Sequence, residues 1–199
     1  MLEHGISFDF FLEGRQVALV VLTEEIVEKT NWYNWFNDEV NMRNMQKHYF
    51  PNTRANQLEF FRKEIAGSKS KFQLGIFNKQ DRALIGMISL NHIDYLNQKC
   101  ELSVLIGEKK YQNLTNFIEA CRLIVVHAFD HLNMNRIYGG CIAKELAEMY
   151  VRILGFQHEG TSVQDIFKNG MHLDCYRFAL LKSDYLRQID RFKKSDTQS

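Results

Sequence analysis

Proline is almost absent from this sequence, because Pro51 is the only one in 199 residues. Since proline stiffens linkers, its scarcity disfavours long rigid connections between domains. No apolar run approaches the ~20 residues that span a bilayer. The N-terminus carries Glu3, His4 and Asp9 among its apolar residues, which is not typical of a signal peptide. We therefore expect one globular domain in the cytoplasm.

An excess of charge of one sign is also lacking. The 25 basic and 24 acidic residues give a net charge of +1, and Lys109 with Lys110 forms only a small local basic spot. A near-neutral chain has no general electrostatic drive toward nucleic acid or anionic lipid. We therefore expect neither nucleic acid nor a membrane among its partners.

Closely spaced cysteines are absent as well. No CxxC occurs, so the sequence predicts neither a zinc knuckle nor a redox pair. Each cysteine lies in an apolar segment, which is typical of buried free thiols in a reducing compartment. His127 and His131 have the four-residue spacing of some metal sites, but His127 neighbours apolar positions, and we predict no metal. The four cysteines are Cys100, Cys121, Cys141 and Cys175.

Apolar periodicity divides the chain into strands and helices. Their order, β-α-α-β-β-β-α-β-α-β-β, predicts an α+β (α/β) domain in which a mixed sheet has helices on both faces. The pair Asn169-Gly170 predicts the turn of the last hairpin. We expect strands over residues 17–22, 72–77, 83–93, 100–106, 136–142, 156–166 and 172–181. We expect helices over residues 24–40, 54–65, 116–132 and 146–154, and a short helix in the tail.

The helix from Asn116 to Leu132 is the clearest, because its apolar residues follow the 3.6-residue period. Asn116 fits an N-cap, and Glu119 stands where a side chain can reach back to the cap. These signals place an irregular loop between the strand that ends near residue 106 and a long core helix.

Three segments carry a family resemblance: LTEEIVEKTNWYNWFNDEV, CELSVLIGEKKYQNLTNFIEA and ILGFQHEGTSVQDIFKNGMHLDCYRFALL. Together they resemble the GNAT N-acetyltransferase superfamily. Within it they are similar to the branch of ribosomal-protein alanine, spermidine and amino-sugar-nucleotide acetyltransferases. The resemblance implies a GNAT-like domain over residues 15–182. An N-terminal extension would cover residues 1–14, and a partly helical tail would cover 183–199.

The resemblance is incomplete at the loop that receives the pyrophosphate of coenzyme A in this family. Relatives usually have glycines there, whereas Asn113, Thr115 and Phe117 stand in those places. Glycine lets the backbone approach phosphate oxygens without a Cβ in the way, and amides at the head of a helix then bind the anion. Asn tolerates unusual backbone angles better than most residues. A poorer cradle and an ordinary capped loop therefore both stay open.

The resemblance implies acetyl-CoA as co-substrate. Basic side chains near the loop would partly replace the missing glycines, and amides of the preceding strand would bind the oxyanion of an acyl transfer. The implied cofactor-binding residues are Val104, Leu105, Ile106, Lys109, Lys110, Asn113, Leu114, Thr115, Asn116 and Lys144.

A second departure from the family lies in KELAEMYVRILGF. Many relatives have an Asn near the start of this helix and a Tyr, five residues before the closing Phe, that protonates the departing thiolate. Here Lys144 and Val151 hold those places. Tyr150 is adjacent, but one residue is a rotation of about 100° on a helix. Both a general acid and a packing residue stay open for Tyr150.

The implied reaction is direct attack of a primary amine on a thioester, which needs a base to take the proton of the amine. Glu101 is the preferred base, and a solvent-facing strand carboxylate is the alternative. His92 and Asp94, near the end of the preceding strand, are candidates for substrate contact. His48 and Tyr49 lie in an irregular segment where relatives line the acceptor pocket.

Two functions therefore stay open. The first is an N-acetyltransferase that moves an acetyl group from acetyl-CoA to the amine of a small molecule or an amino-sugar nucleotide. The second is a degenerate GNAT fold that binds a partner or metabolite without catalysis. The aromatic stretch SFDFFL, residues 7–12, would suit the cover of a neighbouring subunit, so a homodimer is a further expectation.

Overall fold

A single eight-stranded sheet organises the computed structural model, which describes residues 5–45 and 50–193. The strand order is β1-β2-β3-β4-β5-β6-β8-β7, and among these described strands only β5 and β6 pair in parallel. The mixed sheet confirms the predicted fold class. The strands are β1 (Phe10–Glu13), β2 (Val17–Val20), β3 (Phe72–Asn78), β4 (Ala83–Asp94), β5 (Lys99–Ile106), β6 (Arg136–Cys141), β7 (Gln157–Lys168) and β8 (Met171–Leu181).

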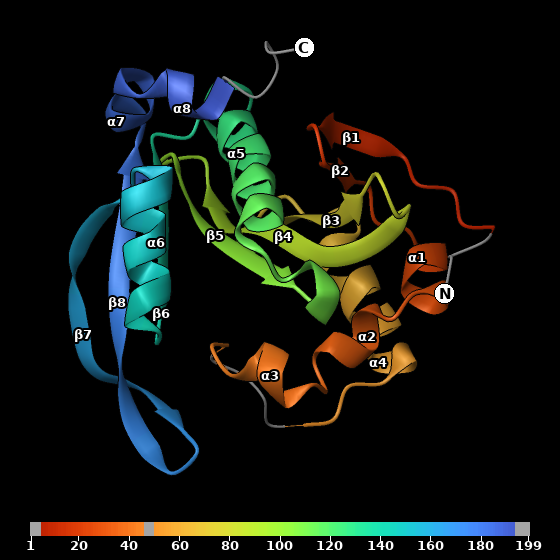
Figure 1. Cartoon of the computed structure of the whole chain (residues 1–199). Coiled ribbons are helices and arrows are strands. Elements are labelled where there is room, and N and C mark those ends of the chain that lie inside the picture. Colours follow the sequence, from red (N-terminus) through yellow and green to blue (C-terminus); the bar gives the residue numbers. More distant parts are fainter. Residues whose placement is uncertain (1–4, 46–49, 194–199) are drawn as a thin grey trace.

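Helices cover both faces of the sheet (Figure 1). On one face α5 and α6 enclose the larger apolar core, and on the other face α1, α2 and α4 enclose a smaller core around two buried tryptophans. The helices are α1 (Glu24–Lys29), α2 (Trp32–Trp35), α3 (Glu39–Met42), α4 (Arg54–Phe60), α5 (Leu114–Asp130), α6 (Lys144–Leu154), α7 (Lys182–Arg187) and α8 (Ile189–Lys193). A π-helical turn, Phe61–Ile65, extends α4, and a 3₁₀ turn, Lys109–Tyr111, precedes α5. None of the described helices is long and apolar enough to cross a membrane.

The expected single helix over residues 24–40 is wrong, because three short helices occupy this stretch. The Thr30 hydroxyl donates to the carbonyl of Ile26, and the Thr30 backbone is extended, which ends α1. The Asp38 carboxylate accepts the N–H of Asn41 and starts α3 as an N-cap. These breaks turn the chain so that Trp32 and Trp35 are both buried.

Helix α5 begins at Leu114, so the expected start at Asn116 is wrong. Asn113 is the N-cap, and its side chain accepts the N–H of Asn116 at 2.9 Å. Asn116 instead donates its side-chain amide to the carbonyl of Tyr111. Glu119 points away from the cap and accepts backbone N–H groups of Gln16 and Val17 at the start of β2. The cap therefore lies three residues before the predicted one. Glu119, which we expected at the cap, instead makes a long-range contact with the start of β2.

The N-terminal extension contributes strand β1, which the sequence pattern did not predict. Phe8 and Phe10 pack on Phe77, and Phe11 packs edge-on against Phe72. The aromatic stretch therefore covers the sheet of its own chain. Strand β1 pairs with β2 across a register shift between residues 10 and 12.

The C-terminal elements agree with the expectations. Asn169 and Gly170 both have positive φ angles, 49° and 78°, as a two-residue hairpin turn requires. Near the tip of that hairpin the Lys168 ammonium donates to backbone carbonyls at the end of α3, including that of Arg43 at 3.1 Å. The described part of the tail, as far as Lys193, is helical, and Tyr185 stacks on Phe129 at 4.8 Å. All four cysteines are buried and free, which confirms the prediction of unpaired thiols.

Candidate functional site

Strands β5 and β6 separate in the middle of the sheet. They pair over only three residues each, Lys99–Glu101 with Arg136–Tyr138. Beyond that point β5 stays with β4 as far as Ile106, while β6 stays with β8 as far as Cys141. The facing backbone edges of β5 and β6 are thus free of each other where the strands diverge.

A cleft of about 370 Å³ occupies the gap between the two strands. Phe117 and Tyr150 line it from α5 and α6, which cover one face of the sheet. Asn41 and Met45 line it from α3 and the segment after α3, which lie on the other side of the sheet in Figure 1. The cleft therefore runs from one face of the sheet to the other between the separated strands.

The loop before α5 forms one wall of the cleft without needing glycine angles. No residue from 107 to 117 has a positive φ, and Asn113 is extended at φ −128° and ψ 161°. Side chains with a Cβ therefore fit this backbone without conformational strain. Gln112 holds the loop, because its side-chain amide donates to the Asn41 side chain at 2.7 Å and to the carbonyl of Ile106 at 2.9 Å.

The remaining glycine of the region, Gly107, is required by packing. A Cβ at this position would lie 2.1 Å from the Trp35 ring. The Trp35 indole N–H donates to the Glu108 carboxylate at 2.8 Å, and Asn41 donates to the carbonyl of Gly107 at 2.9 Å. The first short helices thus fix the strand-to-loop corner that opens onto the cleft.

Comparison with known proteins agrees with this architecture. The model of the acetyltransferase (GNAT) domain family matches residues 17–152. This chain belongs to the GNAT family. Its mixed sheet with helices on both faces is therefore that of a GNAT domain.

Individual relatives are similar to this chain over only part of its length. YdaF of Bacillus subtilis, which bears the provisional name of a ribosomal N-acetyltransferase, is 32% identical over 106 residues, or 53% of this chain and 57% of YdaF. Spermidine N(1)-acetyltransferase of Vibrio cholerae is 25% identical over 155 residues, or 75% of this chain and 87% of that protein. The first curated relatives are matched over only 57% and 64% of their own length.

Solved structures share the GNAT fold. The spermidine N-acetyltransferase of Vibrio cholerae, crystallised with CoA and spermine, superposes with a TM-score of 0.76 at 23% identity. The match covers 86% of this chain and 98% of that one. At this level of identity the match shows the fold, and the chemistry of the site has to be argued from its own residues.

The GNAT cleft brings together six of the residues expected to bind the cofactor or to act in catalysis. Three belong to the free edge of β5, two to the start of α5, and one to α6. In each case the residue lines the cleft. They are Val104, Leu105, Ile106, Asn113, Leu114 and Tyr150.

The two lysines expected to bind pyrophosphate already have partners. Lys109 pairs with Asp38 at 2.7 Å, and the hydrogen bond from Lys109 holds the pKa of Asp38 below its ordinary value. Lys110 lies over the Tyr111 ring and 3.4 Å from Asp81. Neither lysine lines the cleft.

The other expected cofactor residues also lie outside the lining of the cleft. Thr115 is exposed on the first turn of α5, and Asn116 is buried beneath the loop, bonded to Tyr111. Lys144 lines a different cavity, on the opposite side of α6. Contacts of these three residues with a cofactor remain a prediction.

Tyr150 is largely buried among aromatic rings. It stacks on Phe178 at 4.4 Å and meets Phe117 and Phe156 edge-on. Burial raises the pKa of the Tyr150 phenol well above its ordinary value, so the hydroxyl stays protonated. The tyrosine therefore packs the core and also borders the cleft, and its role as a general acid stays a prediction.

Glu101 and His92 lie side by side just before the strands diverge. The His92 Nδ1 is 3.0 Å from the Glu101 carboxylate. His92 has a left-handed φ of 49° at a register shift of β4, and strained backbone of this kind often accompanies functional sites. Asp94 is engaged elsewhere, because it accepts the backbone and side-chain N–H groups of Asn97. His48 and Tyr49 lie outside the described residues.

Sequence reasoning missed Asn41, Gln112 and Cys141 as residues of the cleft. Asn41 and Gln112 bond each other across 71 positions, and no periodic pattern signals such a contact. The sequence signal for this contact is that both residues are polar and lie beside apolar ones, since buried polar groups need hydrogen-bond partners. Cys141 lines the cleft, but burial raises the pKa of its thiol to about 11. A thiol of that pKa is a poor nucleophile near neutral pH.

Proposed function

We propose that this protein transfers an acetyl group from acetyl-CoA to a primary amine. The observation that supports the proposal is the cleft that crosses the sheet where β5 and β6 diverge. Such a cleft admits a thioester from one face and an amine from the other, so that direct attack needs no enzyme nucleophile. The raised pKa of Cys141, the thiol of the cleft, agrees with direct transfer.

The residues of the cleft fit coenzyme A without the glycines that are usual in relatives. The free edge of β5 and the N-terminal amides of α5 meet at the loop, and a helix N-terminus attracts anions. Asn113 satisfies the N–H of Asn116 with its own side chain. The amides of Leu114 and Thr115 would therefore be the ones that hold the pyrophosphate, because the N–H of Asn113 already donates to the carbonyl of Tyr111 at 2.8 Å and Lys109 and Lys110 are paired with acidic residues.

Glu101 would act as the base. Its side chain is 28% exposed, so an amine or a bridging water has access to it. Hydrogen bonding to His92 orients the carboxylate at the start of the cleft. The carboxylate would take the proton of the attacking amine, amides of Val104–Ile106 would stabilise the oxyanion, and the Tyr150 hydroxyl would protonate the departing thiolate.

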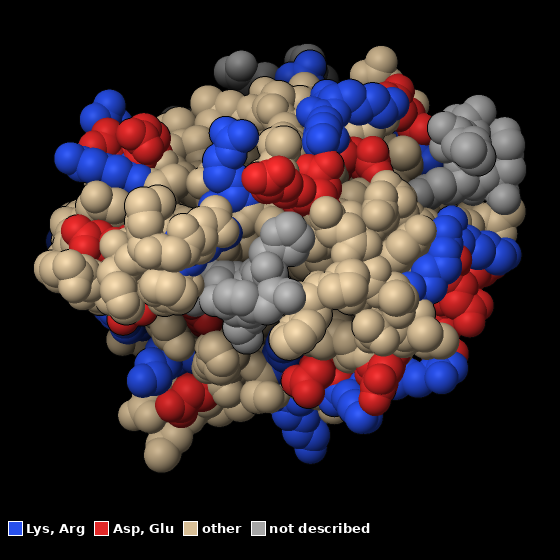
Figure 2. Space-filling view, turned by 90° about the horizontal axis from the view of Figure 1, so that it is seen from below, with Lys and Arg blue, Asp and Glu red and all other residues tan. Residues whose placement is uncertain are grey.

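We further propose that the acceptor is a small-molecule amine that carries few positive charges. Two acidic residues of β7, Glu159 and Asp165, are paired with Arg136 and Arg177. Figure 2, which views the molecule from below, shows basic and acidic side chains interspersed across that face. A polyamine would gain from a dense group of free carboxylates. The amine of an amino-sugar nucleotide therefore suits these residues better, although relatives include spermidine acetyltransferases.

Calorimetry with acetyl-CoA tests the proposal. We expect saturable binding, and a stability gain of ~2.7 kcal/mol at 100 times the dissociation constant. Leu114→Trp should weaken binding, because it places an indole over the cleft from a side chain that is 47% exposed. The matched control is Leu186→Trp, at a 53% exposed position on α7 away from the cleft. Release of CoA with a panel of amines then identifies the acceptor.

The alternative, a GNAT fold that binds without catalysis, is favoured by the pairing of Lys109 and Lys110 with acidic residues. The two functions give different results in the same experiments. A folded protein that shows neither heat nor added stability at millimolar acetyl-CoA would support the alternative. Binding without turnover of any amine would support it as well.

A further inference from the structure

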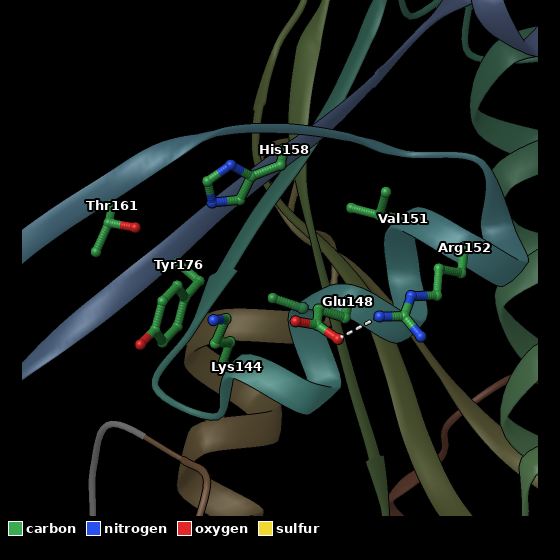
Figure 3. Close-up of a pocket in the computed structure, with 8 residues that line it drawn as sticks. Lys144, Glu148, Val151, Arg152, His158, Thr161 and Tyr176 are labelled. Atoms are coloured by element: carbon green, nitrogen blue, oxygen red, sulfur yellow. Dashed lines mark hydrogen bonds and ion pairs between the residues drawn. The ribbon is translucent and has the colours of Figure 1, made fainter.

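A second cavity, of about 380 Å³, lies between α6 and the strands β7 and β8 (Figure 3). None of the described residues that line it also lines the cleft between β5 and β6. Helix α6 separates the two, because Met149 and Tyr150 face the cleft whereas Ala147 and Val151 face this cavity. The volume falls within the range of small-molecule sites, about 300–1,000 Å³.

The floor of the cavity is apolar. Ala147 is 3% exposed, and Val151 and the Tyr176 ring are half-buried beside it. Figure 3 shows Val151 of α6 and Tyr176 of β8 on either side of a common space. An apolar floor of this kind binds the hydrocarbon body of a ligand by excluding water.

The rim of the cavity carries an unpaired positive charge on Lys144. Within residues 5–45 and 50–193, the Lys144 ammonium and the His158 ring have no ion-pair or hydrogen-bond partner. The acidic residue of the rim, Glu148, is neutralised by Arg152 at 2.8 Å. Figure 3 shows Lys144 and His158 directed toward the same space. The local charge therefore favours an anionic group.

Two hydroxyl groups complete the rim. Thr161 of β7 and Tyr176 of β8 both line the cavity. Their hydroxyls can donate hydrogen bonds to anionic oxygens as well as accept them. Pockets for small molecules combine an apolar lining with a few convergent polar groups of this kind.

We propose that this cavity is a second ligand site, which binds a small apolar molecule carrying one anionic group, such as a carboxylate or a phosphate ester. Lys144 provides the charge, Thr161 and Tyr176 provide hydrogen bonds, and Ala147 and Val151 contact the apolar body. Lys144 would then bind the ligand of this cavity, whose lining it belongs to. The proposal does not depend on the acetyltransferase function, because binding is measured on the protein alone.

NMR titration of the isotope-labelled protein tests the proposal with benzoate and phenyl phosphate as probes. We expect saturable shifts of the amides of Lys144, Ala147 and Val151, with a dissociation constant in the millimolar range or below. Benzylamine has a similar size and the opposite charge, and it should bind at least about tenfold more weakly. A preference between the two anions supports the proposal and identifies the favoured group.

Two variants locate the site. Lys144→Gln should weaken the binding of the anions about tenfold, since it removes the charge that attracts the anionic group. Lys69→Gln, which changes an exposed lysine far along the sequence, should leave binding unchanged. Val151→Phe should weaken binding, because its larger ring takes up part of the apolar floor where the ligand body would lie, and its amide spectrum reports whether the protein is folded.

Three results would overturn the proposal. The first is the absence of saturable shifts with either anion. The second is benzylamine binding as tightly as benzoate. The third is unchanged anion binding in Lys144→Gln when the variant is folded.

Discussion

At the scale of single residues, Asn113 shows how a family motif can lose its glycines. The extended backbone of Asn113 needs no glycine. Its side chain accepts the N–H of Asn116, which would otherwise be free to bind an anion. The loop before α5 is held in place by the hydrogen bond from Gln112 to Asn41, and it does not depend on glycine backbone angles. The absence of the usual glycines is therefore not enough to conclude that the backbone of this loop is strained.

Asn113→Asp tests whether the loop binds phosphate. Asp caps helices about as well as Asn, so the free energy of unfolding should stay nearly the same. The added negative charge should weaken acetyl-CoA binding about tenfold by repulsion. Calorimetry measures the affinity, and Asn56→Asp on the exposed face of α4 is the control. Equal affinity in Asn113→Asp would show that the pyrophosphate lies elsewhere.

Glu101→Gln should lower kcat by about 10²–10⁴-fold, because the amide cannot take the proton of the amine. The affinity for acetyl-CoA should not change, since Glu101 lies outside the lining of the cleft. His92→Asn should have a smaller effect, because it removes only the partner that orients the carboxylate. Glu145→Gln, at an exposed position of α6, is the matched control. Wild-type kcat in Glu101→Gln would remove this residue from the mechanism.

At the scale of elements, Glu119 ties the long helix α5 to the start of β2. Its carboxylate accepts backbone N–H groups of Gln16 and Val17 at 3.1 and 3.3 Å, and also that of Arg15. The contact spans more than 100 positions, and it fixes the helix whose N-terminus borders the cleft. Gly14 is needed beside it, because a Cβ there would meet the Glu119 carboxylate.

Glu119→Ala should destabilise the protein by about 1–3 kcal/mol, because the N–H groups of Gln16 and Val17 would be left unsatisfied. Urea unfolding measures the change. Glu119→Gln retains one oxygen acceptor, so it should lose less stability. A loss that is equal in the two variants would mean that the size of the side chain, and not hydrogen bonding, matters at this position.

The elements that could be predicted from the sequence are those with local signals. The hairpin turn at Asn169-Gly170 and the end of α6 at Gly155 follow from backbone angles that few residues adopt. The three short helices over residues 24–42 could not be predicted, because buried tryptophans and capping bonds override the helical periodicity. The same holds for the start of α5, where Asn113 and Asn116, three positions apart, are both possible caps.

At the scale of the whole molecule, the mixed sheet and its covering helices followed from the order of the elements. The candidate site could be predicted in part, because the end of β5 and the start of α5 are neighbours in sequence. The Asn41–Gln112 contact and the second cavity could not be predicted. They depend on how far-apart segments pack, which periodicity does not encode.

The stability of the whole molecule should depend on pH through His127. Burial, together with the nearby His131, lowers the pKa of His127 below 6.5 in the folded state. The unfolded chain then binds more protons between that lowered pKa and pH 6.5, so stability is lost as the pH falls below about 6.5. His127→Phe should keep the stacking on Phe72 and flatten this dependence. The free energy of unfolding, measured at about pH 7.5 and about pH 5.5 for both proteins, tests this prediction. An equal difference between the two pH values in the variant would exclude His127 as the cause of the pH dependence.

The two outermost strands of the open sheet, β1 and β7, do not pair with their neighbours in one continuous register. β1 shifts register against β2 between residues 10 and 12, and β7 shifts twice against β8. An irregular, twisted border is a poor template for a strand from another molecule. The sheet is thereby discouraged from continuing into a neighbour and from seeding fibrils. An assembly of two copies would have to be built on side chains rather than on shared backbone hydrogen bonds.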